Sequence, residues 1–138
     1  MLSIYPACFY EEKEGGYSVI FPDLNHLATC GNTLPEAIEN AVDVLAGALY
    51  SAKLDGEKWS EPSDISSINV NDEYDEYKSA FVNLVSVDVE EYARKHFNKA
   101  VKKTLTIPAW LNDMAVKQGV NFSAVLQDAL KEQFHISG

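Results

Sequence analysis

The sequence predicts an α+β protein in two parts. Residues 1–90 predict a small, largely antiparallel sheet with one helix, and residues 99–138 predict a strand followed by two helices. Two observations predict the fold of the first part: short runs of residues that favour β-strands, bounded by Gly and Pro, and a long stretch of apolar residues at helical spacing. The charge also changes sign: residues 1–98 hold 18 acidic against 6 basic side chains, whereas the remainder holds 3 against 5. Residues 91–98 are expected to form a connector between two domains with different tasks.

The composition of the 138 residues, 46% hydrophobic and 23% charged, is that of a globular protein. No apolar run is long enough for a membrane span, and the first residues lack the basic start of a secretory signal. The two cysteines, Cys8 and Cys30, are too few for a disulfide framework. The three histidines (His26, His96 and His135) lack metal-ligand spacing. We therefore expect a cytoplasmic protein without a metal or cofactor.

The first part begins with three predicted strands. Residues 2–10 read as a strand, in which Pro6 favours an edge position or a strand start. Gly15 and Gly16 supply the turn of a hairpin to a second strand at residues 17–21. A short third strand is expected at residues 27–30.

A long helix and a fourth strand complete the first part. Thr33 is a predicted helix cap, with Pro35 in the first turn and Glu36 reaching back to the cap. Apolar residues at helical spacing predict the buried face: Ile38, Ala41, Val42, Leu45, Ala48, Leu49 and Ala52. Gly56 ends the helix, residues 57–79 read as a polar loop, and residues 81–89 read as a strand. The predicted order is β-β-β-α-β.

The second part has a different pattern. Residues 101–107 alternate, with Val101, Leu105 and Ile107 on one face and Lys102, Thr104 and Thr106 on the other. Pro108 ends this strand and opens an amphipathic helix, Gly119 ends that helix, and Asn121 is a good cap for the next. A strand and two helices in under 40 residues cannot close a core alone. We therefore predict a homodimer through residues 101–134, with pairing into a higher oligomer left open.

This series of strand, Pro, helix, Gly-x-Asn turn and helix resembles a ribbon-helix-helix DNA-binding module. In such a ribbon the outward strand face enters the major groove of DNA. The free amides at the start of the last helix suit a DNA phosphate. The predicted DNA-binding residues are Lys102, Thr104, Thr106, Asn121, Phe122 and Ser123.

The first part resembles the HicB antitoxin family. The matching segments are Tyr5-Pro-Ala, Gly15-Gly-Tyr-Ser-Val-Ile-Phe-Pro-Asp-Leu24 and Gly31-Asn-Thr-Leu-Pro-Glu-Ala37. At residues 25–27 this chain has Asn-His-Leu where the family usually has Pro-Gly-Cys. The resemblance implies a partial ribonuclease-H-like fold that blocks a HicA-type toxin, a small basic ribonuclease that cleaves mRNA. Together with the ribbon-helix-helix pattern of the second part, this predicts that the dimer represses its own operon by binding operator DNA.

Two other classes of function stay open at this stage. One is a stand-alone ribbon-helix-helix repressor whose acidic domain senses a ligand. The other is a divergent metal-dependent nuclease using Asp23, Glu36 and Asp88, although a structural role accounts for each carboxylate, and we expect no catalytic residues. The acidic run at residues 72–76 is either a solvated loop or a mimic of RNA phosphate. The sequence does not assign the residues that contact the toxin.

Overall fold

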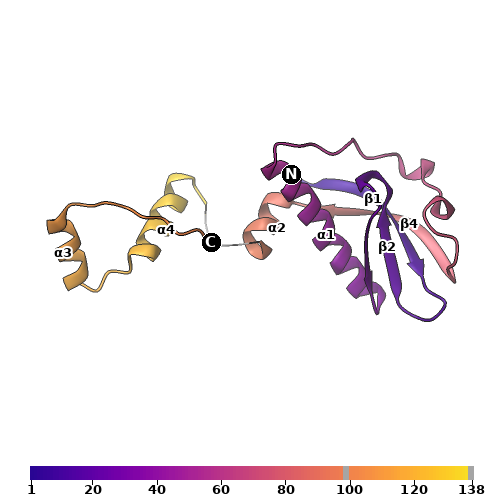
Figure 1. Ribbon diagram of the computed structural model, residues 1–138, viewed down its shortest axis with the longest axis horizontal. Helices are drawn as coiled ribbons and strands as arrows, with labels where there is room; N and C mark the ends of the chain where they lie inside the picture. Colours follow the sequence, from indigo (N-terminus) through magenta and orange to yellow (C-terminus); the bar gives the residue numbers. More distant parts are fainter. Residues whose placement is uncertain (98–99, 137–138) are drawn as a thin grey trace. The chain divides into compact units, whose positions relative to one another are not determined.

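The computed structural model describes residues 1–97 and 100–136. It forms two compact units, Met1–Lys99 and Ala100–Gly138 (Figure 1). None of the helices in the described ranges is long and apolar enough to cross a membrane.

The first unit is built on a four-stranded antiparallel sheet. Its strands are β1 (Ser3–Glu11), β2 (Tyr17–Phe21), β3 (Leu27–Gly31) and β4 (Ser79–Val87), in the spatial order β3-β2-β1-β4. Each neighbouring pair is antiparallel. A single 3-10 turn at Pro22–Leu24 joins β2 to β3. The four predicted strands are confirmed, and the predicted β-β-β-α-β order is correct.

Pro6 does not lie on an edge strand or at a strand start, because β1 is central in the sheet. The Glu12 amide donates a hydrogen bond to the Gly16 carbonyl in the turn between β1 and β2. Because successive residues of a strand direct their backbone N–H and C=O groups to opposite sides, the even-numbered residues of β1 direct theirs toward β2. The pairing of β2 with β1 begins only at Cys8. Pro6 therefore lies beyond the end of β2, where the missing N–H removes no ladder hydrogen bond.

Helix α1 (Leu34–Leu54) covers one face of this sheet, as Figure 1 shows. The Thr33 hydroxyl caps it by accepting a hydrogen bond from the Glu36 amide at 3.3 Å. Gly31 allows the close approach at the helix start, because a Cβ there would lie 2.4 Å from the Ala37 nitrogen. The core consists of alanines and one leucine of α1 against apolar strand residues: Ala37, Ala41, Leu45 and Ala46 against Tyr5, Ala7, Phe9, Val19, Phe21, Val85 and Val87.

The segment between α1 and β4 covers part of the opposite face. It contains two 3-10 turns, η2 (Ile65–Ser67) and η3 (Val70–Asp72). Tyr10, which points away from α1, is fully buried and donates a hydrogen bond from its hydroxyl to the Val70 carbonyl. Its ring packs against Tyr74 and Tyr77 at centroid distances of 5.3 and 5.4 Å. The polar loop predicted here is therefore part of the fold, anchored by tyrosines.

Helix α2 (Val89–His96) occupies most of the stretch expected to be a connector. Ala93 is buried, and the Tyr92 hydroxyl donates to Asp43 of α1 at 2.8 Å. Burial and this contact raise the pKa of Tyr92 to about 12. The Phe97 ring packs 5.7 Å from the ring of Tyr50. Residues 89–97 thus belong to the first unit.

The second unit contains α3 (Ala109–Lys117) and α4 (Phe122–Gln133). The turn between them runs through Gly119, whose φ of +67° favours glycine. Both helices were predicted from the sequence. Residues 101–107 form neither a helix nor a hydrogen-bonded strand within this single chain. The arrangement predicted for that segment needs a second chain and stays a prediction.

Candidate functional site

The second unit has no core of its own. None of residues 100–136 is buried. Large apolar side chains lie open to solvent, with Val101 exposed to 76% and Trp110 to 65%. Val101, Leu105 and Ile107 line a hollow of about 850 Å³ together with apolar residues of α4, including Val125 and Leu130. A surface of this kind is a liability unless another molecule covers it.

The predicted DNA-reading residues precede α3 in the extended segment. Lys102, Thr104 and Thr106 are all exposed. The two threonines are not among the residues that line the apolar hollow, whereas Lys102 contributes to its wall. The threonines therefore fit an outward face better than Lys102 does.

The other predicted DNA-binding residues lie together at the start of α4. The Asn121 side chain caps the helix by accepting a hydrogen bond from the Ala124 amide at 3.1 Å. Phe122 and Ser123 both border the hollow, and the Ser123 hydroxyl accepts from Gln127 at 3.0 Å. The helix start is thus locally well formed. The positive end of its dipole favours an anion there.

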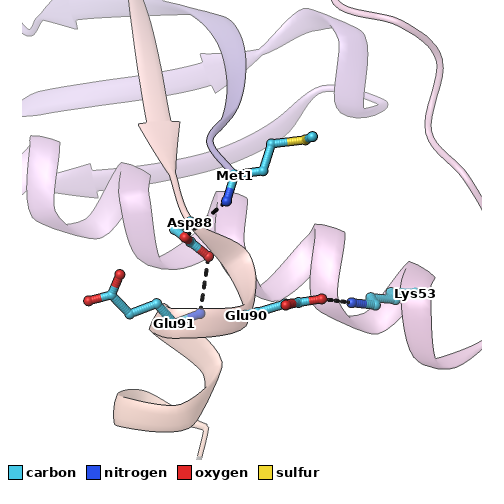
Figure 2. Close-up of polar contacts among 5 residues, drawn as sticks. All are labelled: Met1, Lys53, Asp88, Glu90 and Glu91. Carbon is cyan, nitrogen blue, oxygen red and sulfur yellow. Dashed lines mark hydrogen bonds and ion pairs between the residues drawn. The ribbon is translucent and has the colours of Figure 1, made fainter. Parts of the chain in front are cut away.

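Of the three carboxylates considered for a metal site, Asp23 and Asp88 have structural partners instead. Asp23 accepts hydrogen bonds from the amide and the hydroxyl of Ser63, at 2.8 and 2.6 Å. Glu36 lies in the capped first turn of α1. Asp88 caps α2 (Figure 2), where it accepts from the Glu91 amide. The described residues contain no group of three His, Cys, Asp or Glu side chains placed to hold a metal ion.

Figure 2 shows how the start of α2 is fixed to the rest of the first unit. Besides capping the helix, Asp88 pairs with the Met1 α-ammonium at 3.2 Å. The hydrogen bond from Glu91 and the Met1 charge lower the pKa of Asp88. Glu90 accepts a hydrogen bond from Lys53 of α1, which lowers the pKa of Glu90. These carboxylates hold α2 in place.

The acidic run at residues 72–76 is partly fixed to the sheet. Glu73 is nearly covered and pairs with His26. Asn25 and His26 both have left-handed backbones, with φ of +56° and +60°. Asn is among the residues that tolerate this conformation best, which explains Asn25 at this turn. The Tyr74 hydroxyl donates to Glu12 at 3.0 Å. Part of this run therefore serves the fold.

A feature that the sequence analysis missed is the outer edge of β4. This nine-residue edge strand contains no charged residue and exposes Phe81 and Leu84. The opposite edge, β3, is five residues long, contacts α1, and has its Cys30 carbonyl bonded to the Asn40 side chain. The available signal was an uncharged strand between two acidic runs. Its position at an edge became visible only with the sheet order.

Comparison with known proteins gives the class. Residues 5–129 match the sequence model of a protein family, the HicB-like antitoxins of bacterial toxin–antitoxin systems. A solved chain of a toxin–antitoxin complex from Streptococcus pneumoniae is 33% identical, with a TM-score of 0.62 and coverage of 96% of this chain and 99% of that one. The chain belongs to the family of HicB-like antitoxins.

Two curated relatives are also similar to this chain, and one of them is named as a HicB antitoxin. An uncharacterised 14.9 kDa protein of Haemophilus phage HP1 is 32% identical over 108 residues, covering 78% of this chain and 75% of that protein. Antitoxin HicB 1 of Photorhabdus laumondii is 39% identical over 61 residues, covering 44% of this chain and 39% of that one. The resemblance noted in the sequence is therefore confirmed at the level of the family.

Proposed function

We propose that this antitoxin neutralises a HicA-type, mRNA-cleaving ribonuclease by binding it, and that as a dimer it represses its own operon. In this proposal the chain is not an enzyme. The observation that carries the proposal is the division of the chain into a closed acidic unit and a unit without a core.

Dimerisation follows from the exposed apolar surface of the second unit. Leu105 and Leu130 face a common hollow that residues 1–97 and 100–136 leave empty. A second copy, with its segment 101–107 paired antiparallel, satisfies the backbone of both segments and covers both hollows. The resulting two-stranded ribbon is of the size that enters a major groove.

In that dimer Thr104 and Thr106 read base edges, and the amides at the start of α4 hold a phosphate. The second part of the chain carries a net charge of +2, which a phosphate backbone tolerates. We assign Lys102 to a phosphate contact because its ammonium carries the positive charge of the predicted reading face.

Toxin neutralisation is assigned to the first unit because of its charge. Residues 1–98 carry a net charge of −12, from 18 acidic and 6 basic side chains. A ribonuclease must bind a polyanion and is therefore expected to be basic. An antitoxin can block such an enzyme by binding to it and covering its RNA-binding surface, which requires no catalytic group in the antitoxin.

The DNA-binding proposal is tested with single substitutions in gel-shift titrations. Thr104→Ala or Thr106→Ala should cost about 1–3 kcal/mol on the operator and little on random DNA, since base contacts carry discrimination. Lys102→Ala should weaken binding to both DNAs and reduce the salt dependence. Threonine variants that bind the operator as wild type does would mean that the reading face lies elsewhere.

The toxin proposal is tested by co-expression with the adjacent gene product. The full chain should restore growth and co-purify with the toxin, and Thr104→Ala should do both equally well because it lies in the other unit. Association should be faster at low salt, as expected for oppositely charged partners. A full chain that fails to rescue growth and to co-purify would contradict the proposal.

A further inference from the structure

The outer edge of β4 presents unpaired backbone groups. Within the sheet, Phe81 pairs with Phe9, and the odd positions of β4 form the ladder with β1. The N–H and C=O groups of Ala80, Val82, Leu84 and Ser86 therefore point away from the sheet. In the described part of the chain no backbone hydrogen bond reaches this edge. The Leu84 amide instead bonds to the neighbouring Asn83 side chain at 2.8 Å.

Apolar side chains flank this edge on both faces of the sheet. Phe81, on the α1 face, stacks on Phe9 at 5.0 Å yet stays substantially exposed. Leu84, on the other face, is 51% exposed, and Ile4 of the adjacent β1 lies exposed on the same face. Natural edge strands are usually protected from the addition of another strand by charged residues, by their shortness or by a covering element. The β4 edge is nine residues long, carries no charge and has exposed apolar neighbours. The β3 edge has such protection through its shortness and its contact with α1.

The charges around β4 select the kind of partner. Four carboxylates lie within residues 72–76 before the strand and three within residues 88–91 after it. Residues 72–91 therefore carry a net charge of −6, from seven acidic and one basic side chain. The three after the strand are paired with cations of the same unit, namely the Met1 ammonium, Lys53 and Lys95, so the excess negative charge lies before the strand. A second copy carries the same net charge of −12 over residues 1–98, so pairing two copies at this edge would bring like charges together. A strand of a basic partner would meet opposite charge instead.

We infer that the partner toxin adds a strand to the outer edge of β4 and so extends the sheet of the antitoxin. The inference rests on the proposed toxin neutralisation and specifies its surface. The backbone of β4 supplies the hydrogen bonds, Leu84 and Phe81 supply apolar contacts on the two faces, and the net negative charge of the first unit favours a basic partner.

The test compares Leu84→Lys with Ala28→Lys in the full chain. Both substitutions add one lysine at an exposed edge position, the first on β4 and the second on β3. The probe is the purified product of the adjacent toxin gene, with affinity measured by calorimetry. Leu84→Lys should raise the Kd about tenfold or more, as for loss of a central interface contact, and Ala28→Lys should stay within about twofold. Equal melting temperatures of the free proteins show that both variants fold.

Backbone hydrogen exchange gives an independent readout. On toxin binding the amides of Val82 and Leu84 should become protected, whereas those of β3 should not change. Binding of Leu84→Lys at wild-type affinity, or no added protection in β4, would overturn the inference while toxin neutralisation stands. Leu84→Lys that lowers the oligomeric state but leaves toxin binding intact would identify a second copy as the occupant and also overturn it. A wild-type chain that binds no toxin would remove the proposed function and this inference together.

Discussion

The two units of this chain solve the burial of apolar side chains in different ways. In the first unit, α1 packs its small side chains on the sheet, and residues such as Leu45 and Phe21 are completely buried. In the second, the described residues 100–136 include no buried side chain. The helices of both units have amphipathic sequences. An amphipathic pattern therefore predicts that a face is buried but does not say whether the same chain buries it.

A large effect on assembly is expected from a charge placed in the second unit. Leu130 and Ile38 are almost equally exposed in the single chain, 45% and 44%. If Leu130 faces a second copy, Leu130→Asp buries an unpaired carboxylate in the dimer and should raise the dimer Kd more than about a hundredfold. Ile38→Asp should leave the dimer unchanged. Sedimentation at several concentrations measures both.

If these two variants behave alike, the second unit is not the part of the chain that forms the dimer. A Leu130→Asp chain that remains dimeric at micromolar concentration would mean that the hollow lined by α4 is not the contact between copies. An Ile38→Asp chain that becomes monomeric would instead assign dimerisation to the first unit. Circular dichroism should show helix loss in Leu130→Asp only, because that unit is expected to fold on pairing.

A cavity in the first unit should have an effect of comparable size that is confined to that unit. Leu45→Ala removes a fully buried side chain from the contact between α1 and the sheet, which should cost about 2–5 kcal/mol of unfolding free energy. Denaturant titration followed by the near-ultraviolet signal of the tyrosines measures the loss. The dimer should survive in sedimentation at concentrations where the variant is folded. Loss of the dimer together with the first-unit transition would show that the units depend on each other.

Local chemistry predicted much of the fold. The Thr33 and Asn121 caps, the hairpin glycines and the four strands all follow from side chains close in the sequence. The buried face of α1 was displaced in the prediction: Ile38 is exposed, and Ala37 and Ala46 are buried instead. Small alanines let the helix approach the sheet closely. The spacing of apolar residues alone does not reveal which side of the apolar face of the helix contacts the sheet.

The candidate sites show the same limit. The start of α4 was predictable because a cap and a helix start are local. The outer edge of β4 was not, because an edge is defined by the order of strands and not by any one of them. The anchoring of the polar segment by Tyr10 and Tyr74 likewise depends on a contact between residues far apart in the chain.

Two helix-cap substitutions should affect the two units differently. Asn121→Ala and Thr33→Ala each remove the side chain that accepts a hydrogen bond at a helix start, and each should cost about 1 kcal/mol. In the second unit folding and dimerisation are proposed to be one step, so the Asn121→Ala loss should appear as a weaker dimer. The Thr33→Ala loss should lower the melting temperature of the first unit only. Melting curves at two protein concentrations distinguish these outcomes.

The smallest expected effect is a pH-dependent contribution of Asp88 to the first unit. The Glu91 amide and the Met1 ammonium stabilise the ionised carboxylate and hold the pKa of Asp88 below its ordinary value of 3.8. A lowered pKa in the folded state stabilises the protein above the ordinary value, and that stabilisation is lost as the pH falls through the folded value. Asp88→Asn keeps a cap but removes the charge. Wild type should therefore melt slightly above Asp88→Asn at pH 7, and the difference should disappear on acidification below the lowered pKa. The difference between the two melting temperatures isolates Asp88 from the other carboxylates, and a difference that persists or grows in acid would contradict this role.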